Sequence, residues 1–177
     1  MNDFFAVMGL PRSAWLDGEM LKERFHRLSA ERHPDAPGGS GAAFSMLNEA
    51  WQTLREPVSR LRHFLELTAP ESLVALGGAL PELGDLFMDI AMLKQLAGAM
   101  EKPASPLARA LLVPRRMALL ERFSGVEARL SAAVEKGHGE IRNPAATAAE
   151  LAATLGRLTF LSHWARQMRE LQWALDS

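Results

Sequence analysis

Apolar residues recur at spacings of three and four along most of the chain, which is the pattern of helices with one buried face. Near the N-terminus, Leu21, Phe25 and Leu28 share one face of a predicted helix that Asp17 caps. This helix should end near Arg32, because the residue before a proline is pushed out of the α region. We predict helices at residues 3–8, 17–32, 40–54 and 57–68, which together make a compact all-α unit over residues 1–68.

Residues 69–81 contain two prolines and a Gly-Gly pair, so we interpret them as a linker or hinge. Beyond the linker, helices are expected at residues 83–100, up to residue 136, and from the Asn143-Pro144 capping signal to residue 175. In the second of them, Pro114 is either a kink or the true start, and Gly137-His138-Gly139 is the end. Three long helices with short connections predict an antiparallel three-helix bundle over residues 82–177, with Trp164 and Trp173 in its packing.

The composition excludes several classes of function. The chain has 177 residues, 48% of them hydrophobic and 23% charged, with a formal net charge of -1, so nothing attracts it globally to nucleic acid or anionic lipid. It has no cysteine, which excludes disulfides, thiolate metal sites and a cysteine nucleophile in these residues. The histidines lack metal-ligand spacing, and no apolar run approaches the roughly 20 residues that span a bilayer. We therefore expect a cytoplasmic protein without a metal or cofactor.

The tripeptide His33-Pro34-Asp35 falls between the second and third predicted helices, followed by a glycine-rich stretch that cannot hold regular structure. It should therefore lie exposed at the tip of a helical hairpin. Lys22 and His26 are four residues apart on the preceding helix and share a face away from its apolar stripe. A catalytic base at this tip is disfavoured, because an exposed tip excludes little water. An ordinary turn and a recognition element are the remaining interpretations.

This arrangement resembles the J-domain of DnaJ-type co-chaperones, and the following stretch strengthens the resemblance. The sequence LNEAWQTLREPVSRLRHFLEL at residues 47–67 looks like the corresponding segment of the HscB family, the J-proteins of iron–sulfur cluster assembly. The opening DFFAVMGLPRSAWLD is similar to that family's short first helix and Gly-Leu-Pro turn. The residues that carry the likeness are Asn48, Ala50, Trp51, Thr53, Leu54, Pro57 and Arg60. The resemblance implies an L-shaped, two-domain, all-α protein.

The resemblance also implies a site that docks on a chaperone ATPase of the heat-shock-70 class, of the HscA or DnaK type. The tripeptide of His33, Pro34 and Asp35 would dock on this ATPase and trigger ATP hydrolysis there. A positive face would meet a negative patch of the chaperone; its residues are expected to be Lys22, His26 and Arg27. The family usually has an aromatic residue where this chain has Arg32 and a cation where it has Ala36. These two departures are consistent with weaker ATPase stimulation or with a dedicated partner whose surface is altered to match.

A second site is implied for an iron–sulfur scaffold client of the IscU type. The matching positions are Phe87, Met88, Ala91 and Phe160. A helix that buries Leu86, Ile90, Leu93 and Ala97 would leave the first three turned aside, and methionine-rich exposed patches suit adaptable protein recognition. The alternative that these residues are bundle core stays open. The family's acidic residues after this helix segment are replaced here by Gln95 and Leu96, so the client could differ.

We therefore predict a non-enzymatic co-chaperone that stimulates a heat-shock-70-class ATPase and delivers an IscU-type scaffold. A general DnaJ-like co-chaperone with another client is the first alternative, and a helical adaptor that does not stimulate ATPase is the second. An enzyme that uses the interdomain cleft is the least supported. A weak homodimer stays open.

Overall fold

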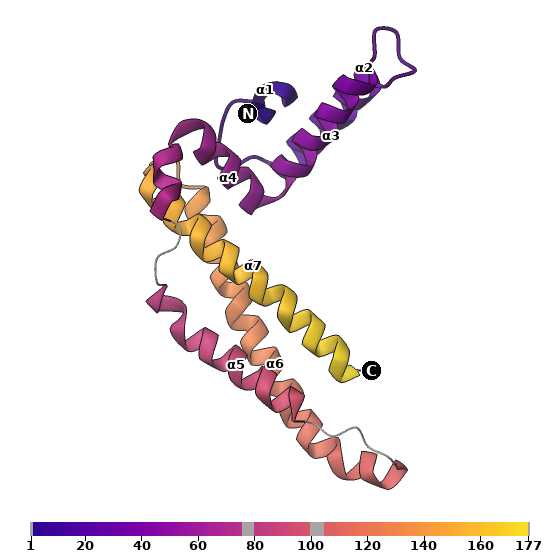
Figure 1. Ribbon diagram of the computed structural model, residues 1–177, viewed down its shortest axis with the longest axis vertical. Helices are drawn as coiled ribbons and strands as arrows, with labels where there is room; N and C mark the ends of the chain where they lie inside the picture. The colour runs from indigo at the N-terminus through magenta and orange to yellow at the C-terminus, as the bar shows by residue number, and fades with distance from the viewer. Residues whose placement is uncertain (1, 76–79, 100–104, 177) are drawn as a thin grey trace. The chain divides into compact units, whose positions relative to one another are not determined.

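The computed structural model describes residues 2–75, 80–99 and 105–176, and the regular elements in these ranges are all helices (Figure 1). The predicted all-α class is thus confirmed. The α-helices are α1 (Phe4–Met8), α2 (Gly18–Arg32), α3 (Gly41–Arg55), α4 (Pro57–Thr68), α5 (Gly84–Gly98), α6 (Pro106–Ile141) and α7 (Ala148–Asp176). Two short 3-10 helices, η1 (Pro70–Ala75) and η2 (Pro81–Leu83), lie in or next to the predicted linker.

The first helices begin where the sequence places their caps. The side chains of Asp3, Asp17 and Ser40 each accept a hydrogen bond from a backbone N–H three residues later, at 3.1, 2.8 and 3.1 Å. These bonds satisfy amides that the first turn of a helix leaves without an internal partner. Pro57 opens α4, where its missing N–H costs nothing. Local capping chemistry therefore sets four of the helix starts.

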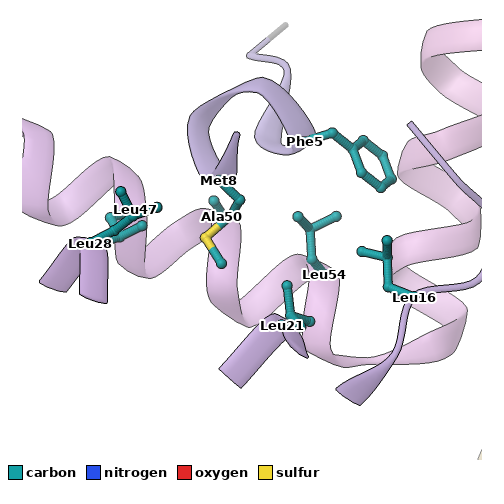
Figure 2. Close-up of a cluster of buried hydrophobic side chains, with 8 residues drawn as sticks. All are labelled: Phe5, Met8, Leu16, Leu21, Leu28, Leu47, Ala50 and Leu54. Atoms are coloured by element: carbon teal, nitrogen blue, oxygen red, sulfur yellow. The ribbon is translucent and has the colours of Figure 1, made fainter. Parts of the chain in front are cut away.

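The core of the N-terminal helices lies between α1, α2 and α3, and it includes Leu21 and Leu28 of the apolar face predicted for α2. Figure 2 shows its eight buried side chains: Phe5, Met8, Leu16, Leu21, Leu28, Leu47, Ala50 and Leu54. Phe25 and Trp51 stack beside this core with ring centroids 4.7 Å apart, which fastens α2 to α3. The residue that packs before the start of α2 is Leu16, whereas Trp15 stays partly exposed beneath the guanidinium of Arg142, 5.9 Å from its ring centre.

Contacts divide the chain into two compact units, Met1–Gly77 with His138–Gly156, and Gly78–Gly137 with Arg157–Ser177. The first unit therefore combines α1–α4 with the end of α6 and the start of α7. Ile141 is buried there, in a pocket wall that it shares with Leu16 and Pro57. The division cuts across the predicted second domain, and the boundaries at residues 68 and 82 stay a prediction, as does the L shape.

In the second unit, parts of α5, α6 and α7 pack as a three-helix bundle. Asp89 of α5 pairs with Arg129 of α6, and Lys94 of α5 donates to Gln167 of α7. Antiparallel α6 and α7 approach closely at Gly137, where an added Cβ would lie 2.7 Å from a methyl carbon of Leu158. The core residues are Leu86, Ile90, Leu93, Leu119, Phe123, Val126, Leu130, Leu158, Leu161 and Met168.

Three expectations about the bundle helices are wrong. The second helix does not end at Gly137 but continues to Ile141, because this glycine serves close packing between α6 and α7 rather than chain reversal. Asn143 shapes the turn by accepting from the N–H of Ala145, and α7 begins only at Ala148. Trp173, expected in the bundle packing, is 77% exposed. Pro114 lies inside α6, which begins at Pro106.

Candidate functional site

The tripeptide lies at the end of the α2–α3 hairpin, which Figure 1 shows as two helices side by side joined by a loop. His33 follows α2 with φ −55° and ψ 139°, an extended conformation that the next proline favours. His33, Pro34 and Asp35 are all exposed, and the Asp35 side chain keeps 91% of its accessible surface. The exposed tip that the sequence predicts is therefore present.

Two contacts hold the His33 ring. The backbone N–H of Asp35 donates to Nδ1 of His33 over 3.3 Å, and the ring meets Phe44 of α3 edge-on with centroids 5.4 Å apart. A neutral imidazole that accepts at Nδ1 carries its proton on Nε2. The ring therefore offers a donor to a partner while its other nitrogen is occupied within the loop.

The loop that carries the tripeptide is closed by backbone hydrogen bonds. The N–H of Ala36 donates to the carbonyl of His33, and the N–H of Gly39 donates to the carbonyl of Ala36, both at 2.9 Å. Gly38 has a φ of +80°, which favours glycine, and a Cβ on Gly39 would lie only 1.8 Å from the His33 carbonyl oxygen. The two glycines thus fix the direction in which the tripeptide leaves the hairpin, a role that their position in the sequence did not reveal.

The cationic face of α2 consists of Lys22, His26 and Arg27, and all three side chains are exposed. Arg24 has a different role, because its Nε donates to the carbonyl of Met8 over 2.8 Å and ties α2 to the end of α1. A cation at that position also suits the negative end of the α1 dipole. Lys22, His26 and Arg27 therefore line the side of the hairpin, while Arg24 belongs to the contact between α1 and α2.

Two buried polar side chains support the base of the hairpin. Arg60 donates from Nε to the carbonyl of Ala14 and from Nη1 to the carbonyl of Leu54, and burial lowers its pKa from the ordinary value. His63 accepts from the N–H of Phe4 through Nε2 over 3.1 Å. Burial lowers the pKa of His63, although the neighbouring Glu66 carboxylate opposes this shift. His63 is thus a core histidine whose Nε2 has a hydrogen-bond partner.

The predicted client residues are exposed on the bundle. Phe87 and Met88 keep 52% and 63% of their surface, Phe160 keeps 43%, and Ala91 is also exposed. Leu86, Ile90 and Leu93 of α5 are buried, as the predicted outward patch requires, and Ala97 is half-buried. The interpretation of these four residues as bundle core is therefore wrong.

Trp164 joins the two aromatic members of this patch. Its ring centre lies 5.8 Å from that of Phe87 on α5 and 6.3 Å from that of Phe160 on α7. The three rings border a groove of about 560 Å³, which we call the aromatic groove. Its other walls are Leu80, Leu83, Gly84 and the polar side chains of Lys94, His163 and Gln167. The sequence suggested bundle packing for Trp164, and its spacing of four from Phe160 was the available signal for a shared face.

We also searched the described parts of the chain for metal sites and membrane-spanning helices. No three His, Cys, Asp or Glu side chains gather there into a metal site. No helix in the same ranges is long and apolar enough to cross a membrane. The candidate sites are therefore two exposed surfaces, one polar and one apolar, of the type used in protein recognition.

Comparison with known proteins identifies the N-terminal part. The sequence model of the DnaJ domain family matches residues 3–63. These residues form a DnaJ domain. The chaperone protein DnaJ of Nostoc punctiforme is 32% identical to the chain over 108 residues, which are 58% of this chain and 28% of that protein. This match spans much less than two thirds of that relative.

Solved structures extend the likeness beyond the DnaJ domain. HscB from Vibrio cholerae aligns with a TM-score of 0.54 at 20% identity, covering 98% of this chain and 99% of that one. Human co-chaperone protein HscB aligns with a TM-score of 0.51 at 19% identity, covering 96% and 81%. At these identities the likeness establishes the fold. Together with the match to the DnaJ domain it confirms the predicted resemblance to HscB-type J-proteins.

Proposed function

We propose that the chain is a co-chaperone whose DnaJ domain binds a heat-shock-70-class chaperone, of the HscA or DnaK type, and stimulates its ATPase. The observation that carries this proposal is the exposed tripeptide on a loop closed by its own backbone. A rigid loop presents an imidazole donor and a carboxylate without a large ordering cost on binding. ATP is hydrolysed by the partner, and this chain supplies the surface that triggers hydrolysis.

The cationic face of α2 supports the same partner. Lys22, His26 and Arg27 lie along the hairpin that ends in the tripeptide, so they would meet a negative surface next to the docking point. Charges at the rim of an interface mainly raise the association rate and are screened by salt. ATPase stimulation should therefore fall as ionic strength rises, and Lys22→Ala with Arg27→Ala should weaken this salt dependence. Arg62→Ala, an exposed cation of α4, is the matched control.

We also infer a client of the iron–sulfur scaffold class, of the IscU type, held at Phe87, Met88, Ala91 and Phe160. Their exposure and the HscB-like fold support this inference. A DnaJ-like co-chaperone with a different client is the alternative that the substituted positions Gln95 and Leu96 favour.

Steady-state ATPase assays with the cognate chaperone test the first part of the proposal. Wild-type protein should stimulate hydrolysis, and His33→Gln should abolish most of the stimulation, because an amide cannot reproduce the ring that Phe44 and the Asp35 amide hold. His163→Gln, on an exposed histidine of the second unit, should keep it. Equal stimulation by wild type and His33→Gln would contradict docking through the tripeptide, and no stimulation by wild type would favour the adaptor.

Pull-down of an IscU-type scaffold tests the second part. Wild type should retain the scaffold, and Phe87→Ala with Met88→Ala should release it. Val113→Ala, at an exposed apolar position of α6, is the control for a loss of apolar surface elsewhere on the unit. Stimulation of the ATPase without scaffold binding would favour the general co-chaperone with another client.

A further inference from the structure

The aromatic groove has a polar rim at one end whose hydrogen-bond donors outnumber its acceptors. The ammonium of Lys94 donates to Oε1 of Gln167 over 3.2 Å, which turns the amide nitrogen of Gln167 toward His163. That nitrogen lies 2.7 Å from Nε2 of His163, while a guanidinium nitrogen of Arg166 lies 3.0 Å from Nδ1. Two donors therefore compete for one imidazole.

No protonation state of the His163 ring accepts both hydrogen bonds. A neutral imidazole accepts through only one of its two nitrogens, and a protonated imidazole accepts through neither. In either state, Arg166 or Gln167 lacks its acceptor within this chain of contacts. Lys94 and Arg166 are exposed, so both also bring positive charge to the same end of the groove. A carboxylate is the group that would accept from these donors and balance their charge.

The opposite end of the groove differs in charge. There Gly84 lines the wall, the next residue is the exposed Asp85, and Glu82 already pairs with Arg157 over 3.9 Å. An acidic partner would gain little at that end. The charge distribution therefore gives the groove a direction, with the anion of a partner at the Lys94 end.

The three aromatic rings of the groove indicate which uncharged side chain a partner would insert. Trp164 is partly buried between Phe87 and Phe160, so a side chain that enters the groove contacts three rings. Tryptophans at the centre of a contact surface, surrounded by groups that exclude water, carry a large share of binding energy. Trp164 is thus the expected anchor of the surface, although the sequence assigned it to packing.

We propose that the aromatic groove binds a partner protein segment that inserts a large apolar side chain over Trp164 and places an adjacent carboxylate against Lys94 and Arg166. This inference rests on the client-binding role proposed for the same surface and names the chemistry of its partner. The occupant is a protein segment with acidic residues beside an apolar face.

Two synthetic helical peptides with the same Leu-Met-Phe face test this chemistry on the full chain. One carries glutamates beside that face and the other carries lysines at the same positions. Binding is followed by NMR titration of the Trp164 indole N–H. We expect the glutamate peptide to bind about tenfold more tightly, with a preference that shrinks as salt rises. Equal affinity for the two peptides, or no binding, would overturn the proposal.

Variants separate the contributions of charge and ring. Lys94→Glu combined with Arg166→Glu should reverse the preference between the peptides, whereas Arg169→Glu should not. Arg169 is exposed on the same helix but lines a different groove, between α6 and α7, so it matches the charge change. If Arg169→Glu also reverses the preference, long-range electrostatic attraction and not contact with Lys94 and Arg166 would explain it. That result would overturn the proposed carboxylate site.

Trp164→Ala should weaken binding of both peptides about tenfold, and Trp173→Ala, on an exposed indole of α7, should leave it unchanged. Thermal unfolding shows whether Trp164→Ala still folds, and the charge variants test the proposal independently of that result. Sedimentation should show a monomer. A dimer that dissociates in Trp164→Ala would assign the groove to a second copy of this chain instead.

The peptide and scaffold experiments can contradict one proposal without contradicting the other. Glutamate preference without scaffold binding would remove the IscU-type client and keep the proposed partner chemistry. Scaffold binding that depends on Phe87 and Met88, combined with peptides that bind equally, would keep the client and overturn the cationic rim.

Discussion

The tripeptide loop and the aromatic groove differ in what holds their side chains in place. In the loop, backbone hydrogen bonds and two glycines fix the chain, so His33 and Asp35 project from a rigid frame. In the groove, Phe87 and Phe160 stand on helices whose buried faces fix only their starting positions, and about half of the surface of each side chain remains exposed. The loop should therefore tolerate almost no change, while the groove should adapt to modest changes of shape.

The largest expected effect comes from a methyl group inside the loop. Gly39→Ala would place a Cβ 1.8 Å from the His33 carbonyl oxygen, so the loop must shift and carry the tripeptide with it. ATPase stimulation should fall about tenfold or more, in line with a displaced docking group. Gly41→Ala is the matched control, because a Cβ there meets nothing within 4 Å. If both variants stimulate like wild type, the rigid-loop interpretation is wrong.

The next effect concerns the core beneath the hairpin. His63→Gln should lower the free energy of unfolding by about 1–3 kcal/mol, because the N–H of Phe4 loses a well-placed acceptor and the stacking on Phe5 is lost. The variant should also change the pH dependence. The folded state holds the neutral ring with a lowered pKa, so its stabilisation is complete above about pH 6.5 and is lost as pH falls through the folded pKa.

Urea unfolding between pH 7.5 and 5.5 measures this difference. Wild type should lose stability faster than His63→Gln as the pH falls, since only the wild type has a ring that gains a proton more readily in the unfolded state. Parallel curves for the two proteins would mean that His63 does not titrate in this range. The test also sharpens the comparison between loop and groove. If ATPase stimulation by His63→Gln falls in proportion to its free energy of unfolding, the loss reflects stability and not a change in the tripeptide loop.

A smaller effect is expected from the ring that supports the tripeptide. Phe44→Leu removes the edge-on contact with His33 but keeps an apolar side chain on α3. ATPase stimulation should fall about threefold, corresponding to the loss of a contact between aromatic rings. Phe64→Leu, which alters a partly buried ring of α4 beside the same core, is the control. Equal losses in both variants would point to stability rather than to the orientation of His33.

The smallest effect should come from the client residue Met88, next to Phe87 of the groove. Met88→Leu keeps the apolar character of an exposed position and should change scaffold affinity less than about twofold, since hydrophobic swaps of similar volume are tolerated best. Asp35→Asn, an equally conservative change in the loop, should remove most ATPase stimulation. If scaffold binding were as sensitive to Met88→Leu as stimulation is to Asp35→Asn, the contrast between a rigid and an adaptable surface would not hold.

The loop and the groove also differ in how far the sequence predicted them. The tripeptide is contiguous and follows a helix that its own caps and a proline define, so its exposure followed from local pattern. The groove depends on Phe87 and Trp164, which lie 77 positions apart, so only helix packing could bring their rings together. The choice between core and surface for Met88 likewise depended on which face of α5 the bundle covers.

Arg24 and Gly137 illustrate the same limit. In the sequence, Arg24 is one of several basic residues of its helix, and Gly137 belongs to the predicted end of another. The structure gives Arg24 the carbonyls at the end of α1 and gives Gly137 a close neighbour on α7. In both cases the deciding partner lies well beyond one helical turn.

Helix number, most helix starts and the exposed tripeptide were thus determined by the sequence alone, because capping, proline geometry and apolar spacing act over four residues or fewer. Tertiary structure decided the carbonyl partners of Arg24 and Arg60, the length of α6, and the meeting of Trp164 with Phe87. These features depend on contacts between residues far apart in the chain, whose partners no local pattern specifies.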